Sequence, residues 1–279
     1  MVAKTDRYIN IFDRGRKIIP FNTMDNELRI IITAILAVLG ACVASFINVA
    51  ALRGAKGESF VAGRSRCPKC GAELRWFELI PVISWLIQAG RCRRCKVRIS
   101  PRYLIVEIVG AASSAMCFVR YGLTWMTPLA LVVTLILLAV ALFDAGSMEI
   151  PNGLVIALIP LAVLSIWAQP GLTLLSRGIG IFTVSLPMLL LALVINGAFG
   201  GGDIKLMAVC GFLLGWQNTV LAFFVAVVTA GIIVITLIAR GKAKKGAHIA
   251  FGPHLCLGVA AAMLYGKEII NWYLRLFGI

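Results

Sequence analysis

The sequence is poor in charged residues. Only 14% of its 279 residues are Asp, Glu, Lys or Arg, whereas 60% are hydrophobic. Soluble domains carry roughly 25% charged residues, so the composition excludes an ordinary soluble protein and indicates an integral membrane protein. Apolar runs near the ~20 residues that span a bilayer predict an all-α polytopic membrane protein of about eight transmembrane helices. These runs cover about residues 29–52, 103–120, 125–143, 152–169, 175–195, 203–216, 218–239 and 250–266.

The sequence also lacks an evident cleavable signal peptide and any second long polar region. Its first 28 residues are polar and mixed in charge, and the apolar run that follows is long enough to span a membrane. We therefore expect one helical bundle that carries one inserted soluble module. The expected parts are a surface or disordered tail (1–28), the first transmembrane helix (29–52), a cytoplasmic zinc-binding loop (53–102) and a transmembrane catalytic core (103–279).

Acidic residues are scarce, and the net charge is +15. Twelve of the 27 basic residues lie between Arg53 and Arg102, and four more lie in the stretch 240–246. Both stretches border apolar runs, so the positive-inside rule places them in cytoplasmic loops. This distribution argues against a nucleic-acid partner and favours anionic membrane lipids. Six basic residues up to Arg29 conflict with the resulting orientation.

Because the chain has only twelve acids, each acid in an apolar run is informative. An ionised acid deep in a bilayer costs at least ~2.5–3.5 kcal/mol, so it persists mostly where it has a function. Asp144 ends the third predicted span and Asp203 begins the sixth, which places both at one membrane face. Two carboxylates at one site tend to share a proton. Such a pair can deprotonate a water while it protonates a scissile carbonyl, which is peptide hydrolysis without a nucleophilic side chain.

Three glycines, Gly200, Gly201 and Gly202, precede Asp203. Without Cβ atoms they let a substrate backbone approach and let the helix break before the acid. The alternative for each aspartate alone is a helix N-cap or an interfacial charge.

Glu107 could pair with a basic loop residue or line the substrate groove. The two histidines, His248 and His254, have no partners at metal-ligand spacing.

Four cysteines stand out in the polar insertion. Cys67, Cys70, Cys92 and Cys95 form two C-x2-C pairs separated by 21 residues, a spacing typical of a closed structural zinc site. Iron, two disulfides and a redox-active pair are the other readings, and a cytoplasmic location argues against disulfides. The stretch between the pairs, "LRWFELIPVISWLIQ", is too apolar for a soluble linker. It could form a small core over the metal or a platform that dips into the headgroup layer.

Several blocks together resemble the type IV prepilin peptidases, membrane aspartic proteases of the GxGD type. They include "ASFINVAALR", "SRCPKCGAEL", "WFELIPVISWL", "GRCRRCKVRISPRYLIVE", "FDAGSMEIPN", "GGGDIKLMA" and "IAFGPHL". The resemblance covers about residues 40–260, in the order and near the spacing of the family. Ala44 replaces the usual glycine of the first block, and Gly54-Ala55 replace the usual Leu-Pro after Arg53.

The resemblance implies an endopeptidase of the bacterial inner membrane, with its active site facing the cytoplasm. It would remove the short basic leader of type IV prepilin or pseudopilin precursors, as in type IV pilus or type II secretion systems. Its catalytic pair would be Asp144 and Asp203, with Asn48, Glu107 and the zinc module as further contributors. Relatives with the four-cysteine loop commonly also methylate the new N-terminus with S-adenosylmethionine. The residues themselves carry no sign of this second activity, since no G-x-G-x-x-G follows a strand.

Two readings from other classes compete. A proton-coupled transporter could use the two aspartates as a relay, although the sequence shows no internal repeat and the two acidic blocks differ in every flanking residue. An assembly factor could use the zinc loop to dock a partner. A peptidase without methyltransferase activity is the nearest alternative. Either aspartate can serve as the base of the predicted pair.

Overall fold

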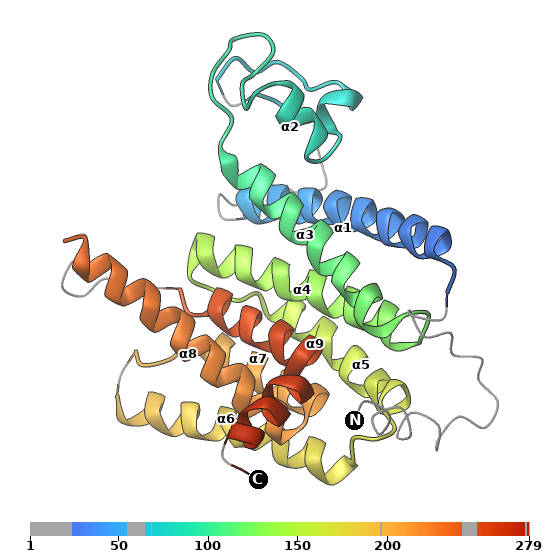
Figure 1. Ribbon diagram of the computed structural model, residues 1–279. Coiled ribbons are helices and arrows are strands. Elements are labelled where there is room, and N and C mark those ends of the chain that lie inside the picture. Colours follow the sequence, from blue (N-terminus) through green and yellow to red (C-terminus); the bar gives the residue numbers. More distant parts are fainter. Residues whose placement is uncertain are drawn as a thin grey trace.

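The computed structural model describes residues 24–54, 65–67, 69–195, 197–241, 250–276 and 278 (Figure 1). Within these residues the secondary structure is helical, apart from two isolated β-bridges near the cysteines. The elements are α1 (Asn26–Gly54), the 3-10 helix η3 (Trp76–Leu79), α2 (Ile83–Ile87), α3 (Pro101–Tyr121), α4 (Met126–Ser147), α5 (Asn152–Ala168), α6 (Leu174–Val194), α7 (Gly201–Leu214), α8 (Trp216–Ala239) and α9 (Gly252–Leu276).

A long helix occupies each of the eight stretches predicted from the apolar runs. Five of them, α1, α3, α4, α6 and α8, are long and apolar enough to cross a membrane, and α5 is a shorter apolar helix of 17 residues. Of the roughly eight predicted spans, five helices therefore qualify as candidate membrane spans by length and composition. The 14-residue α7 covers roughly 21 Å at 1.5 Å per residue, less than the ~30 Å hydrocarbon core.

Helix ends follow local sequence signals. Ser100 caps α3 by accepting a hydrogen bond from the Arg102 N–H, and Pro101 takes the first helical position, where its missing N–H costs nothing. Gly215 separates α7 from α8 with a φ of 74°, a left-handed conformation that glycine adopts without strain. The chain therefore turns sharply at Gly215 and sends α8 back across the bundle.

The helix α4 forms the centre of the bundle. It packs against α1 and α3 on one side and against α5 and α9 on the other, as Figure 1 shows. Its residues contribute much of the apolar core, which α7 and α9 complete. By contrast, the outward faces of α1, α6 and α8 carry exposed Leu, Ile, Val and Phe side chains. This arrangement suits a bundle surrounded by lipid.

Three helix pairs cross where small residues meet. Gly40 of α1 faces Gly110 of α3, Gly180 of α6 faces Gly211 of α7, and Gly258 of α9 faces the Ala222 carbonyl of α8, each so closely that a Cβ would collide with the opposite helix. Small residues at such crossings allow the backbone–backbone packing that holds membrane helices together. These contacts fix α7 and α9, the two helices that begin beside the acids described below.

A buried arginine secures the far end of α7. Arg177 of α6 is fully buried and donates hydrogen bonds to the Ser165 carbonyl at 2.9 Å, the Ser165 hydroxyl at 2.6 Å and the Phe212 carbonyl at 3.2 Å. The first two acceptors lie near the end of α5 and the third near the end of α7. The guanidinium therefore satisfies helix-terminal carbonyls and ties α5, α6 and α7 together.

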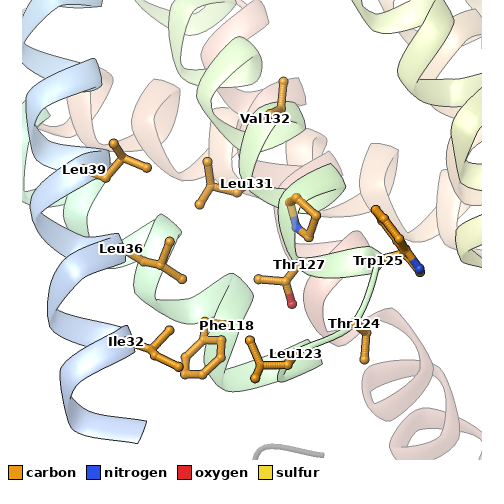
Figure 2. Close-up of a pocket in the computed structure, with 11 residues that line it drawn as sticks. Ile32, Leu36, Leu39, Phe118, Leu123, Thr124, Trp125, Thr127, Leu131 and Val132 are labelled. Carbon is orange, nitrogen blue, oxygen red and sulfur yellow. The ribbon is translucent and has the colours of Figure 1, made fainter. Parts of the chain in front are cut away.

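An apolar hollow lies away from the acids, among α1, α3 and α4. It has a volume of about 560 Å³ and is lined by α1, the end of α3 and the start of α4. Figure 2 shows its apolar walls, which include Leu36, Phe118 and Leu131. Asp144 lies 12 residues beyond Val132, the last lining residue of α4, or roughly 18 Å along the helix. The hollow is therefore not the site of the aspartates.

Candidate active site and cysteine module

Asp144 lies in the last turn of α4 and is 5% exposed. Its Oδ2 accepts a hydrogen bond of 2.9 Å from the backbone N–H of Gly252, the first residue of α9. A helix N-terminus presents free N–H groups and a partial positive charge, so it favours a carboxylate there. The start of α9 therefore orients Asp144, 108 residues away in the sequence.

Asp203 is the third residue of α7 and is 8% exposed. Its Oδ2 accepts a hydrogen bond of 3.3 Å from the N–H of Gly200, which occupies the N-cap position. The interpretation of Asp203 as the N-cap is therefore wrong, because the N-cap, Gly200, lies three residues before it. Its buried Oδ1 has no hydrogen-bond partner within the part of the chain that is described. That oxygen therefore has an unused capacity to accept a hydrogen bond.

Two phenylalanines bring the aspartates to one place. Phe199 precedes Gly200, Phe251 precedes Gly252, and their ring centroids lie 5.7 Å apart. The two glycine N–H groups that hold the carboxylates therefore belong to neighbouring loops. Asp144 and Asp203 are also close enough to interact electrostatically. The structure thus brings together the two acids that the sequence analysis placed at one membrane face.

Contacts between α7 and the loop after α4 fix the same arrangement. A Cβ at Gly202 would lie 2.8 Å from the Ile150 Cβ, so only glycine permits this approach. Lys205, one turn further along, donates a hydrogen bond of 3.1 Å to Asn152 Oδ1. The segment that follows Asp144 therefore packs directly on the helix that carries Asp203.

The geometry supports acid–base chemistry at one point. Two buried carboxylates that interact cannot both ionise easily, so one proton tends to be shared between them. Each is held on one oxygen by a backbone N–H, which leaves the other oxygen for proton transfer. Such a pair can take a proton from water and give one to a leaving group, as in aspartic proteases.

The three glycines differ in their surroundings. A Cβ added at Gly200 would lie 3.2 Å from the Asp203 carboxylate, and one added at Gly202 would collide with Ile150. A Cβ added at Gly201 would have no atom of the described residues within 4 Å. Gly201 is exposed. Of the three, it is the position where another backbone could approach, as we expected for the whole triplet.

Gly252→Ala tests the hold on Asp144. The new Cβ would lie 2.6 Å from Asp144 Oδ2, so the carboxylate must move. Since a displacement near 1 Å can cost about 10²-fold in rate, we expect a loss of that order in precursor cleavage. Gly231→Ala is the matched control, because its added Cβ meets nothing within 4 Å. Equal cleavage rates for the two variants would contradict the assigned role of Gly252.

Glu107 and Asn48 lie between α1 and α3, beside the cysteine module. Glu107 is buried, with Oε1 accepting from the Ser45 hydroxyl and Oε2 from the Val82 N–H, both at 2.7 Å. Asn48 is fully buried and accepts a hydrogen bond of 3.2 Å from Arg102 Nε. Within the described residues, no hydrogen bond joins either of them to Asp144 or Asp203. Glu107 instead joins the module to α1 and α3.

We expect Glu107→Ala to loosen the module while Glu107→Gln largely spares it. The alanine leaves the Ser45 hydroxyl and the Val82 N–H without their acceptor, at about 1–3 kcal/mol for each buried group. The glutamine can accept from Val82 and donate to Ser45. Limited trypsin digestion at the exposed arginines of the module measures the difference. Equal cleavage of the two variants would contradict the clamp.

His254 is buried in α9, and its Nδ1 lies 3.2 Å from the Thr229 hydroxyl of α8. Its ring also packs near Phe251. These contacts place His254 in the packing between α8 and α9. His248 lies outside the described residues.

The four cysteines converge, as their spacing predicts. The Sγ atoms of Cys67, Cys70, Cys92 and Cys95 all lie within 4.8 Å of one another, and the Cys67–Cys95 pair is 3.7 Å apart. Sulfurs of a tetrahedral zinc site with Zn–S bonds of ~2.3 Å lie roughly 3.8 Å apart. The cluster therefore fits a tetrahedral metal ion, with zinc as the expected one.

The two cysteine pairs have the same backbone geometry. Cys67 N–H bonds to the Ala72 carbonyl as Cys92 N–H bonds to that of Val97, five residues on in each case. The fourth residue after each first cysteine, Gly71 or Lys96, has a φ of 67° or 58°. Such repeated turns aim backbone N–H groups at the sulfurs.

These N–H groups favour thiolates. Hydrogen bonds from the backbone of Cys70 and Lys69 lower the pKa of the Cys67 thiol to about 6. Although the Val97 N–H acts to lower the pKa of Cys95, burial and the three other thiols raise it to about 11. Four thiolates together need a cation, and the basic residues around them supply only part of the compensation.

Sequence comparisons give concordant matches. Residues 38–121 match the Bacterial Peptidase A24 N-terminal domain, and residues 131–235 match the Type IV leader peptidase family. The prepilin leader peptidase/N-methyltransferase of Bacillus subtilis is 33% identical over 87% of this chain and 98% of its own length. The protein of the same name from Pseudomonas aeruginosa is 32% identical over 79% of this chain and 78% of its own length. That from Legionella pneumophila is 31% identical over 76% of this chain and 75% of its own length. No solved structure matches at a significant level.

Proposed function

The chain belongs to the type IV leader peptidase family, and on that premise we propose that it is a membrane aspartic endopeptidase acting on type IV prepilin or pseudopilin precursors. It removes their short basic leader at the cytoplasmic face of the inner membrane. The observation that carries the proposal is the pair of buried aspartates, each held by the N–H of a glycine that follows one of two packed phenylalanines.

The proposed mechanism uses only groups that the chain supplies. The precursor's scissile peptide approaches beside Gly201, where space is open. The ionised aspartate takes a proton from a water as that water attacks the scissile carbonyl, and the protonated one stabilises the oxyanion. The aspartate that took the water's proton then gives it to the leaving amine, and the C–N bond breaks. Either Asp144 or Asp203 can act first as the base, because each has one oriented oxygen.

A second reaction follows from the relatives' shared name. We propose that the new N-terminus, once free, is methylated on its α-amino nitrogen by the same enzyme. S-adenosylmethionine supplies the methyl group and becomes a thioether, and the amine loses a proton. We assign no residue to this reaction. The metal site is structural in our proposal, because four thiolates leave no open coordination position.

Cleavage of a co-expressed pilin precursor tests the proposal. The intact mass of the product should show loss of the leader and gain of one methyl group. Omitting S-adenosylmethionine from the purified reaction should abolish the methyl gain but spare cleavage. No cleavage of several different pilin precursors would contradict the peptidase proposal and favour the transporter or assembly-factor readings. Cleavage without methylation at saturating methyl donor would support the peptidase alone.

A further inference from the structure

The stretch between the two cysteine pairs, Trp76–Ile87, exposes its apolar side chains. Trp76 is 78% exposed, Ile83 54%, Leu86 58% and Ile87 81%. They do not form a core over the cysteines. Exposed apolar side chains gathered in one short segment indicate contact with a membrane or a partner. We call this segment the wedge.

The wedge is tied to the sides of two apolar helices of the bundle. Its Val82 N–H bonds to Glu107, which lies six residues inside α3, or roughly 9 Å along the helix from its start. The other oxygen of Glu107 binds Ser45, nine residues before the end of α1. Both helices are long and apolar enough to span a membrane. The wedge therefore lies beside turns within these two helices rather than beyond their ends.

The tie fixes the wedge firmly. Val82 has a φ of 63° and a ψ of −55°, and the Ile83 N–H bonds to the Pro81 carbonyl at 2.6 Å. This is a γ-turn of the strained, positive-φ kind, which persists only where the surroundings enforce it. The buried Glu107 carboxylate supplies that enforcement. The apolar side chains are thus held in place rather than carried on a loose loop.

Charge selects the occupant. Arg75, Arg93 and Arg94 line a small hollow with Glu78, and the Arg93 guanidinium lies over the Phe77 ring, 5.3 Å from its centroid. An arginine-rich hollow repels a basic leader, an argument that rests on the proposed function, but it suits lipid phosphates. Arginine and tryptophan beside exposed isoleucine and leucine are also the composition of interfacial segments.

We propose that the wedge inserts into the leaflet next to α1 and α3, with Ile83, Leu86 and Ile87 among acyl chains and the arginines on anionic lipid headgroups. Insertion of 5–10 Å is usual for such segments. The cysteine module is then held at the membrane surface instead of in free solution. The proposal requires only residence in the membrane, so it can fail or hold independently of the peptidase reaction.

Fluorescence quenching of Trp76 tests the insertion. Wild type and Trp76→Phe, each reconstituted in vesicles of phosphatidylcholine and phosphatidylglycerol, give the emission of Trp76 by difference. We expect strong quenching by lipids brominated near the headgroup end of the chain, and several-fold weaker quenching by aqueous iodide than for a free indole. Trp272→Phe is the matched control, because Trp272 is also an exposed tryptophan but belongs to α9 and not to the wedge. Iodide quenching as efficient as for free indole would overturn the proposal.

Headgroup selectivity is tested in the same vesicles. Brominated phosphatidylglycerol should quench Trp76 more than brominated phosphatidylcholine at equal mole fraction. The double variant Arg93→Gln/Arg94→Gln should lose the difference, while Lys267→Gln, an exposed cation on α9, should keep it. Metal content of each variant verifies that the module is folded. Equal quenching by both lipids in the wild type would overturn the headgroup assignment, whether or not the enzyme cleaves a precursor.

Discussion

Asp144→Asn and Asp203→Asn each abolish precursor cleavage if the two carboxylates act as proposed. An amide neither accepts the proton of the attacking water nor passes one to the leaving amine, and acid–base catalysis of this kind contributes roughly 10²–10⁴-fold. Asparagine keeps the size of the side chain and can still accept from the Gly252 or Gly200 N–H, so the bundle should fold. Cleavage of a pilin precursor in membranes, at matched expression, measures the loss.

Glu149→Gln is the matched control for that loss. Glu149 is an exposed carboxylate five residues after Asp144, so it shares the local charge but not the burial. It should retain the wild-type cleavage rate. Wild-type rates in either aspartate variant would remove that aspartate from the mechanism, and an equal loss in Glu149→Gln would show that the assay reports local charge rather than the buried pair.

Cys67→Ser should remove the metal and unfold the cysteine module. A serine hydroxyl is a far poorer ligand than a thiolate, and structural zinc supplies about 10–16 kcal/mol of apparent folding free energy in small zinc-finger peptides. We expect the metal content to fall close to zero and trypsin to cut the module much faster. Elemental analysis of the purified protein gives the first quantity and digestion gives the second.

Cys42→Ser provides the comparison for this loss, because Cys42 is exposed on α1 and lies outside the cluster. Its metal content and digestion should match the wild type. Unchanged metal content in Cys67→Ser would contradict the four-thiolate site. If the bound metal is iron instead of zinc, the identity of the ion changes but the assignment of the four cysteines as its ligands does not.

Local composition predicted much of this architecture. Each apolar run became a helix because a chain in lipid must satisfy its backbone hydrogen bonds within the segment, and that requirement acts residue by residue. Alternating helix direction then placed Asp144 and Asp203 at one end of the bundle. The doubled C-x2-C spacing predicted the thiol cluster because this signal is also local: each pair forms one self-contained turn.

Long-range contacts could not be predicted in this way. Nothing near Asp144 in the sequence indicates that its hydrogen-bond donor is Gly252, although two Phe-Gly steps, at Phe199 and Phe251, each precede a helix. The clamp of Glu107 on Val82 depends on how α3 lies beside the module. Both contacts arise from tertiary packing, which apolar periodicity does not encode.

The pH dependence of single-turnover cleavage tests the shared proton of Asp144 and Asp203 most directly. With both carboxylates protonated at low pH the pair has no base, and with both ionised at high pH it has no acid. We therefore predict a bell-shaped rate profile with two apparent pKa values that belong to the pair. A rate that rises through one ionisation to a plateau and stays there at high pH would contradict a shared proton.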